Sequence, residues 1–157
     1  MPYIIDGNNL IGSSPDISLE DPNSRQKIVD IIRKFQENKK TSVIVVFDGE
    51  PDYYSHHQVL TNKLTIIYPR FGGTADDEIK KILNRYTYFR DVVLVSSDRE
   101  LKDFAKNKGA KTINSTEFHF ELKRSYRAQG KKENTDKRIN TRLSKNEVDQ
   151  WLKVFED

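Results

Sequence analysis

Three short apolar runs in this sequence each end at or near an aspartate, and this repeated pattern constrains the fold more than any other feature. The aspartates are Asp6, Asp48 and Asp98, and they follow the runs at 3–5, 42–47 and 92–95. Runs this short and this rich in β-branched residues predict buried strands of a parallel sheet. Because all strands of an open parallel sheet end at the same edge, we expect the three carboxylates to lie along that edge.

Helical patterns separate the expected strands. Asp21 is the expected N-cap of a first helix, with Pro22 at its first position and an apolar stripe that continues to about Asn38. Further helices are expected over about 75–86, 99–108 and 116–126, further strands over 64–68 and 111–114, a turn at 6–9 and a loop over 50–62. This alternation predicts an α/β fold of three layers, with a mainly parallel sheet between two helical layers.

The residues that the chain lacks exclude several classes of protein. It has no cysteine among its 157 residues, which excludes disulfides, zinc–thiolate sites and cysteine nucleophiles. No apolar run approaches the roughly 20 residues of a membrane helix, and the N-terminus enters a strand at once, without a signal peptide. We therefore expect a cytoplasmic protein that does not enter a membrane.

Two units are expected along the chain. Residues 1–127 form one α/β domain, and residues 128–157 form an appendage made of a basic linker and a C-terminal amphipathic helix. Ser144 and Glu147 suit the capping box of that last helix, and Trp151 lies on its apolar face. We expect this face to pack on the domain or on a second copy of the chain, which leaves a homodimer open.

A fourth aspartate joins those at the strand ends. Asp76 opens the helix that follows another strand, so we expect it at the same edge as Asp6, Asp48 and Asp98. Hard divalent cations such as Mg²⁺ or Mn²⁺ prefer oxygen ligands and can activate water at a phosphodiester. A single aspartate at a strand end is more commonly a turn former or helix cap, but four at matched places favour a metal site. Asp77 is a further candidate, although it also suits a first-turn acid that complements the helix dipole.

Positive charge is concentrated in the C-terminal part of the chain. Between residues 123 and 145, nine Lys or Arg residues stand against two acids, although the whole chain has a net charge of only +3. A mildly acidic domain with a basic tail predicts a polyanionic partner such as RNA, and a solvated terminus is the alternative. The candidate RNA contacts are Lys123, Arg124, Arg127, Lys131, Lys132, Lys137 and Arg138.

Polar and aromatic residues gather in the expected loop. They are Tyr53, Tyr54, His56 and His57. Such side chains suit stacking on unpaired bases, and an ordinary surface loop explains them equally well. Arg70 and Arg99 flank the expected site and suit phosphate binding, with solvation as the simpler role for each alone.

Four blocks of the sequence, in this order, resemble the motifs of the NYN domains, which are PIN-like ribonucleases. The blocks are IIDGNNLI at 4–11, VVFDG at 45–49, TADDEI at 74–79 and VSSDRE at 95–100. The likeness is greatest to the bacterial YacP branch and covers roughly residues 3 to 126. It implies a PIN-like sheet, Mg²⁺ or Mn²⁺, and endonucleolytic cleavage of RNA. The YacP branch also suggests translation-linked RNA decay, which leaves an association with the ribosome open.

The resemblance implies roles for single residues as well. Asp6, Asp76 and Asp98 match the metal-site acids of the family. Asn9 matches the asparagine that positions the phosphate or a metal-bound water, and Asp48 matches a second-strand acid of variable role.

One departure from the family pattern and two other functions bear on this interpretation. Asn8 stands where the YacP branch commonly has an aromatic residue, so a base contact from this turn is not expected to be kept. A catalytically inactive RNA-binding module would use the same fold and tail without cleavage. A small-molecule phosphatase would use similar acids, but its Asp-x-Asp nucleophile motif is missing where Asp6-Gly7-Asn8 stands.

Overall fold

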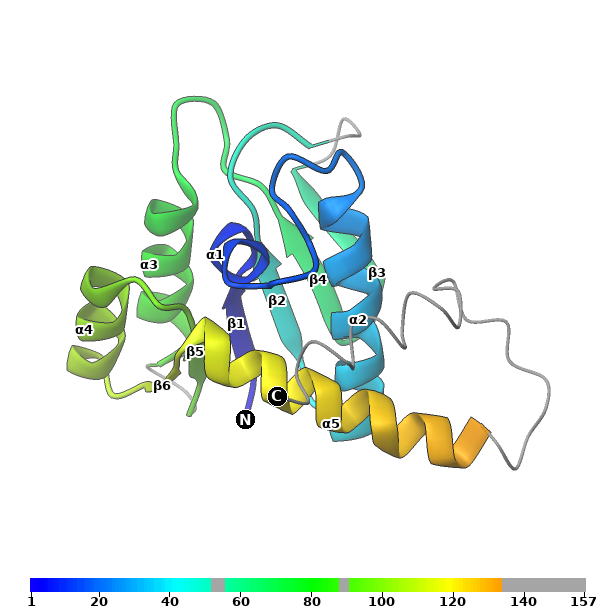
Figure 1. Ribbon diagram of the computed structural model, residues 1–157. Coiled ribbons are helices and arrows are strands. Elements are labelled where there is room, and N and C mark those ends of the chain that lie inside the picture. Colours follow the sequence, from blue (N-terminus) through cyan, green and yellow to red (C-terminus); the bar gives the residue numbers. More distant parts are fainter. Residues whose placement is uncertain (52–55, 88–90, 134–157) are drawn as a thin grey trace.

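Apolar strands and amphipathic helices alternate along the chain, as the sequence predicts. The structure is a computed structural model that describes residues 1–51, 56–87 and 91–133, with side chains described no further than residue 127. The strands are β1 (Tyr3–Asp6), β2 (Val43–Val46), β3 (His57–Thr61), β4 (Leu64–Ile67), β5 (Val93–Val95) and β6 (Lys111–Ile113). The helices are α1 (Gly7–Gly12), α2 (Ser24–Lys39), α3 (Ala75–Tyr86), α4 (Arg99–Asn107) and α5 (Ser115–Glu133). Figure 1 shows their arrangement.

The strands form one sheet in the order β3-β4-β2-β1-β5-β6, and all neighbours are parallel except β3 and β4. β1 lies between β2 and β5, so that Ile5 pairs with Val45 on one side and with Val95 on the other. The chain extends the sheet from β1 first toward β4, and then in the opposite direction with β5. The carboxyl ends of β1 and β5 therefore border the point where the strand order reverses, which is where open α/β sheets bind ligands.

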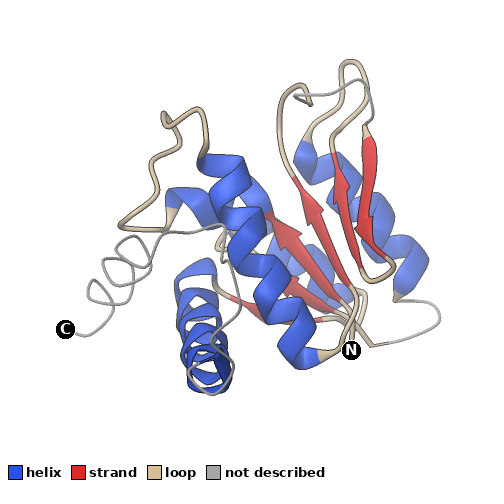
Figure 2. Cartoon of the chain, turned by 90° about the vertical axis from the view of Figure 1, so that its right-hand side faces the viewer, coloured by secondary structure: helices blue, strands red, loops and turns tan. Residues whose placement is uncertain are grey.

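Two apolar cores cover the two faces of the sheet. In β1, Ile5 belongs to the core beneath α1, α2 and α5, whereas Ile4 belongs to the core beneath α3 and α4. Both side chains are fully buried, because successive side chains of a strand point to opposite faces. Figure 2 shows the sheet between its helices. The predicted three-layer α/β fold with a mainly parallel sheet is confirmed.

An aromatic cluster joins the sheet to two of the helices. The ring of Tyr3 lies 5.2 Å from that of Phe35 in α2 and 5.8 Å from that of Phe118 in α5, and the two phenyl rings lie 5.0 Å apart. Each such pair contributes roughly 0.5–1.5 kcal/mol beyond the burial of its apolar area. The cluster fixes α5 against α2, so the first turn of α5 has a defined place beside the ends of the strands.

The prediction of a loop over 50–62 is wrong for its last part, because residues 57–61 form the strand β3. This strand pairs antiparallel with β4 through a tight turn at Asn62 and Lys63. It lies at the edge of the sheet and leaves Val59 and Leu60 exposed. An edge strand with no covered face lacks the apolar run by which the other strands are recognised in the sequence.

The expected turn at 6–9 is the start of a short helix, α1. Its first residue, Gly7, follows β1 without a linker, and Leu10 and Ile11 are fully buried in the larger core. Six residues are too few for a helical apolar pattern to be recognised in the sequence.

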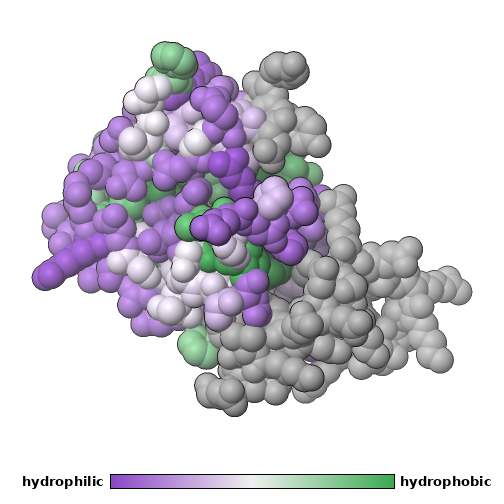
Figure 3. Space-filling model, turned by 45° about the horizontal axis from the view of Figure 1, so that its top comes forward, coloured by the Kyte–Doolittle hydropathy of each residue, from purple (hydrophilic) through white to green (hydrophobic). Residues whose placement is uncertain are grey.

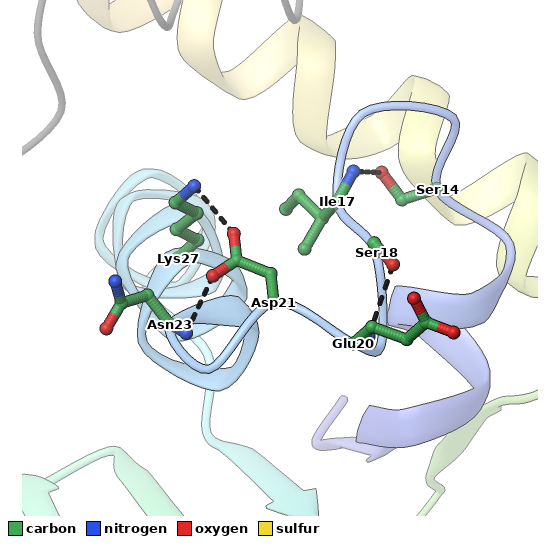
Figure 4. A network of polar contacts seen from close by, with 7 residues as sticks. All are labelled: Ser14, Ile17, Ser18, Glu20, Asp21, Asn23 and Lys27. Atoms are coloured by element: carbon green, nitrogen blue, oxygen red, sulfur yellow. Dashed lines mark hydrogen bonds and ion pairs between the residues drawn. The ribbon is translucent and has the colours of Figure 1, made fainter.

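The first long helix begins later than predicted. α2 starts at Ser24 with Asn23 at the N-cap position, so Asp21 is not the N-cap. Asp21 instead accepts hydrogen bonds from Asn23 N at 2.8 Å and from Lys27 Nζ at 2.9 Å. Two serine hydroxyls of the same loop also accept backbone N–H groups, as Figure 4 shows. The connection between α1 and α2 thus satisfies its polar groups locally.

The expected linker that starts at 128 is helical over its first six residues, because α5 continues to Glu133. Ala, Gln, Lys and Glu, which make up most of 128–133, extend a helix readily once buried turns have formed it, even without an apolar stripe. The rest of the linker and the expected last helix lie outside the described residues. Among the described helices, none has the length and apolar character needed to cross a membrane.

Candidate active site

The structure places all four predicted aspartates at the carboxyl edge of the sheet. Asp6 is the last residue of β1, Asp48 lies two residues beyond β2, and Asp98 is the N-cap of α4 after β5. Asp76 is the second residue of α3, which starts at the same edge. Asp6 is buried, Asp76 and Asp98 are half-buried, and Asp48 is exposed. The set therefore runs from the interior to the surface beside the reversal of strand order.

Three of these aspartates also hold the N-termini of helices. An oxygen of Asp6 accepts from Asn9 N in α1 at 3.5 Å, one of Asp98 accepts from Leu101 N in α4 at 3.1 Å, and one of Asp48 accepts from Ala75 N in α3 at 2.8 Å. Within the described part of the chain, the second oxygens of Asp48 and Asp98 have no hydrogen-bond partner. These two carboxylates can therefore support a helix and still bind a ligand.

A buried hydroxyl joins two of the aspartates. Ser96, which is fully buried, donates from Oγ to Asp6 Oδ2 at 3.2 Å and accepts from Asp98 N at 3.1 Å. The adjacent Ser97 accepts a hydrogen bond from Ser115 N at 3.0 Å through its own hydroxyl. These two serines thus connect the end of β5 to β1 and to α5.

The two asparagines that follow Asp6-Gly7 bind segments on opposite sides of β1. Asn9 binds the segment after β5, and Asn8 binds the segment after β2. Asn9 Oδ1 accepts from Ser97 N at 2.8 Å and from Ser115 Oγ at 2.6 Å. Its Nδ2 has no partner among the described residues and is available as a donor. Asn8 Oδ1 accepts from Asp48 N at 2.9 Å. The sequence gave no sign of this role of Asn8, because its partner lies 40 positions away.

Two further contacts hold the segment that carries Asp48. Arg25 of α2 donates from Nη2 to Asp48 O at 2.8 Å, and its guanidinium lies over the rings of Phe47 and Tyr68. Gly7 packs so closely on Phe47 that a Cβ atom at this position would lie 2.4 Å from its ring. The glycine of the Asp-Gly-Asn-Asn segment is therefore required by close packing.

Electrostatics couples the four carboxylates. Burial raises the pKa of Asp6 to about 6, assisted by the negative charges of Asp76 and Asp48 and opposed by the hydrogen bonds from Asn9 and Ser96. The pKa of Asp76 is also raised, first by burial and then by the charges of Asp98 and Asp48. Among the described residues, none of the four forms a salt bridge. The site therefore holds mutually repelling negative charge that a cation would relieve.

The oxygen atoms of the four aspartates suit a hard divalent cation, although the carboxylates are not arranged tightly around one position. Carboxylate oxygens are the ligands that Mg²⁺ and Mn²⁺ prefer, and the negative charge of the set, which Lys80 offsets only in part, favours them. Among the residues that the structure describes, no three His, Cys, Asp or Glu side chains are gathered tightly enough to form a ready-made metal site. The carboxylates would therefore have to rotate in order to share an ion.

The structure separates Asp77 from this group and adds Glu100. Asp77 is exposed, and it is not among the charges that raise the pKa of Asp6 or Asp76. Its N–H is bound by Thr74 Oγ at 3.1 Å, as predicted for a first-turn position. Glu100 of α4 raises the pKa of Asp76 and pairs with Lys80 Nζ at 3.0 Å. No sequence pattern marked this pair, because its partners lie on different helices.

The predicted RNA contacts of the tail are only partly described. Lys123 is 5% exposed, because it lies next to the buried face of α5 that Phe118, Leu122 and Tyr126 form. The structure therefore contradicts its place among surface contacts for phosphate. Arg124 and Arg127 are exposed, as expected. The side chains of the other candidates are outside the described set: Lys131, Lys132, Lys137 and Arg138.

The surface around the carboxyl edge is polar. Figure 3, in which the top of the view in Figure 1 comes forward, shows a face on which hydrophilic residues predominate. Such a face suits a charged, solvated substrate better than an apolar one.

Comparisons with known proteins agree with this architecture. A family model described as the YacP-like NYN domain matches residues 3–156, which includes the region of the expected appendage. The crystal structure of Rae1 (YacP) from Bacillus subtilis is similar with a TM-score of 0.73 and 20% sequence identity, over 86% of this chain and 80% of that chain. A single-substitution mutant of the same protein has a TM-score of 0.70 and 19% identity, over 98% and 99%. No curated protein sequence matches significantly. The structural likeness confirms the PIN-like fold.

Proposed function

The chain belongs to the YacP-like NYN domain family, and from that premise we propose that it is a metal-dependent endoribonuclease that hydrolyses RNA phosphodiester bonds. Membership of this family indicates a ribonuclease type of function. One observation carries the proposal: Asp6 and Asp98 are joined through the buried hydroxyl of Ser96 where the strand order reverses, with Asp76 and Asp48 within electrostatic reach.

Asp6, Asp76 and Asp98 are the proposed ligands of Mg²⁺ or Mn²⁺, with Asp48 as a further oxygen donor. Their support is the shared edge of the sheet and the raised pKa of Asp6 and Asp76, which burial raises first and the neighbouring carboxylates raise further. A bound ion of this kind supplies Lewis-acid chemistry, which activates water and stabilises the charge that develops on a phosphodiester.

The residues around the acids suit the handling of a phosphate. Asn9 has its carbonyl oxygen occupied by Ser97 and Ser115, so its Nδ2 is held ready to donate to a phosphate oxygen. The helix that Asp98 caps, α4, begins at the same edge, and its N-terminal end favours an anion. Ser96 keeps Asp6 and Asp98 in a fixed relation while the substrate binds.

An inactive RNA-binding module and a small-molecule phosphatase are both compatible with the fold, but the residues of the site fit them less well. An inactive RNA-binding module has no use for a buried carboxylate whose ionisation is disfavoured, as that of Asp6 is. A small-molecule phosphatase with an aspartate nucleophile would have a second acid at residue 8, where Asn8 instead holds the backbone of Asp48.

The direct test is cleavage of end-labelled, unstructured RNA by the purified protein with Mn²⁺, Mg²⁺ or EDTA. We expect internal cuts with either metal and none with EDTA. Asp98→Asn should lower the rate by at least about 10–100-fold, the cost typical of losing even a residue that supports a metal ligand. Asp103→Asn, an exposed position on the same helix, is the matched control.

Each alternative has its own outcome in this experiment. Cleavage in EDTA, or wild-type cleavage by Asp98→Asn, would contradict the proposal. RNA binding without cleavage in any metal would favour the inactive module, and metal-dependent hydrolysis of a simple phosphate monoester alone would favour the phosphatase.

The cellular setting is a further part of the proposal. We propose that the protein acts in the cytoplasm in translation-linked RNA decay, and that it meets its RNA on the ribosome. Sedimentation of the purified protein with ribosomes through a sucrose gradient tests this, and a protein that stays at the top of the gradient at low salt would contradict it.

A further inference from the structure

A groove with a volume of about 710 Å³ opens between α3 and the hairpin of β3 and β4, away from the contacts that join the aspartates. Its size falls within the roughly 300–1,000 Å³ of ligand-binding sites in proteins. Three cations and a phenyl ring line it, above a floor that includes Ile67 and Ile82. We propose that this groove binds a single-stranded segment of RNA and leads it to the aspartates, an inference that rests on the proposed function.

The charge of the groove suits a polyanion. Arg70, Lys81 and Arg85 are its cations, and all three are exposed. Glu78 is its one acid among the described residues, and it lies 3.7 Å from Lys81 Nζ. A surface pair of this kind contributes little to stability. The groove therefore has net positive charge, which can hold phosphates without requiring a base sequence.

Phe71 is the exposed aromatic residue of the groove, at 101% of its reference area, whereas Tyr68 in the same lining is buried. Phe71 lies in a tight turn that is closed by a hydrogen bond of 2.8 Å from Gly73 N to Arg70 O, and Gly72 in this turn has φ +78°. A ring in this position does not stabilise the folded protein, because an apolar side chain contributes to stability only when folding buries it. An exposed aromatic ring beside cations is what proteins use to stack the bases of single strands.

Helix α3 connects the groove to the acidic site. Asp76 is in its first turn, whereas the groove residues Glu78, Lys81, Ile82 and Arg85 lie on another face of the helix, roughly 120–180° away from Asp76 at about 100° per residue. From Asp76 to Arg85 the helix rises by about 14 Å. Arg70 and Phe71 follow β4 at the same edge of the sheet as the aspartates, so a strand that leaves the groove past this turn rounds the N-terminal end of α3 to reach them. An acidic peptide would satisfy the cations but would leave the exposed ring without a role.

The test measures binding of an unstructured, fluorescent RNA 12-mer over a salt series in EDTA, so that cleavage plays no part. The groove variant is R70Q/K81Q/R85Q. We expect the slope of log affinity against log salt to flatten by up to about 2 units, since each neutralised phosphate of a single strand contributes roughly 0.7.

The control variant removes three exposed cations from the other edge of the molecule, at the ends of α2 and α4 and the start of β6. It is K39Q/K106Q/K111Q, with the same loss of charge. We expect it to keep the wild-type slope.

The ring is tested separately. Phe71→Ala should lower affinity by about 5- to 150-fold at every salt concentration, the range that corresponds to loss of one stacked base. Phe71→Leu keeps an apolar side chain but cannot stack, and should lose as much, whereas Phe71→Trp should bind at least as well as wild type. Full exposure of the side chain makes these variants safe for folding.

Several results would overturn the proposal. They are equal slopes for the two triple variants, wild-type affinity of Phe71→Ala, absence of RNA binding by the wild type, and competition by poly-glutamate as strong as that by RNA of equal charge. Failure of the proposed function is distinguishable from failure of the groove. A protein that binds RNA through the groove but never cleaves it refutes the nuclease alone, and cleavage with unaltered binding by the groove variants refutes the groove alone.

Discussion

Replacement of Asp6 by asparagine is expected to make the protein inactive and more stable. Asp6 is 6% exposed, and burial together with the charges of Asp76 and Asp48 raises its pKa to about 6. Asparagine removes the charge and keeps the shape. Its oxygen can still accept from Asn9 N, and its amide can donate to Ser96 Oγ, which now donates to Asp6.

The magnitude and its pH dependence follow from the pKa of Asp6. The folded protein holds this proton more tightly than the unfolded chain, whose aspartate has a pKa of 3.8. The contribution of Asp6 to stability is therefore complete below about pH 3.8 and is lost as the pH rises through 6. The difference of about 2 pKa units corresponds to about 3 kcal/mol. Asp6→Asn avoids this cost, so it should be more stable by up to about 3 kcal/mol at pH 8 and by little at pH 4.

Thermal unfolding in EDTA at pH 8 and pH 4 measures this directly. For a chain of this size, about 3 kcal/mol corresponds to a rise in Tm of roughly 6–12 °C at pH 8. Asp103→Asn, at an exposed position, should shift Tm at neither pH. Added Mn²⁺ should raise the Tm of the wild type by binding to the folded state, and should raise that of Asp6→Asn less. A variant less stable than wild type at pH 8, or an equal difference at both pH values, would refute the reasoning.

Three further predictions address the packing, the hydroxyl and the tail. Gly7→Ala should cost about 1–3 kcal/mol in urea unfolding at any pH, because its Cβ would lie 2.4 Å from the ring of Phe47; an unchanged midpoint would contradict this. Ser96→Ala removes a hydrogen bond that lowers the pKa of Asp6, so the acid limb of kcat/KM against pH should move to higher pH; a limb that stays or moves lower contradicts it. Glutamine at four basic tail positions should flatten the salt slope of RNA binding by up to about 3 units and leave cleavage at saturating RNA unchanged, and identical slopes would mean that the tail does not bind RNA. These positions are Lys131, Lys132, Lys137 and Arg138.

The sequence was sufficient to predict the layered fold and the shared edge of the aspartates. Both depend on local patterns, namely short apolar runs, helical stripes between them and the common direction of parallel strands. Asp6 and Asp98 needed only the ends of their strands to be placed, and Asp76 only the start of its helix. These patterns place the residues at one edge of the sheet but give no distances between them. How close their carboxylates lie could therefore not be predicted from the sequence.

The contacts that hold the site were not predictable, because they join residues distant in sequence. Asn9 and Ser115 are 106 positions apart and meet through a single hydrogen bond, with no periodic signal. Lys123 shows a related limit. Counting positive charges along the sequence does not show which face of a helix each one lies on. The helical register of α5 places Lys123 beside the buried apolar residues of that helix. The edge strand β3 was missed because its exposed side chains resemble those of a loop.

Helix capping and metal binding, which are competing explanations for an aspartate at a strand end, are compatible in this site. A carboxylate has two oxygens, and Asp98 uses one for Leu101 N while the other has no partner among the described residues. Asparagine caps a helix as well as aspartate does, but alanine does not. Asp98→Ala should therefore be less stable than Asp98→Asn by about 0.5–2 kcal/mol, while both lose cleavage to the same extent. Urea unfolding and RNA cleavage of the two variants separate these roles: equal stabilities would show that the cap contributes nothing, and retained cleavage in Asp98→Asn would show that Asp98 is a cap and not a ligand.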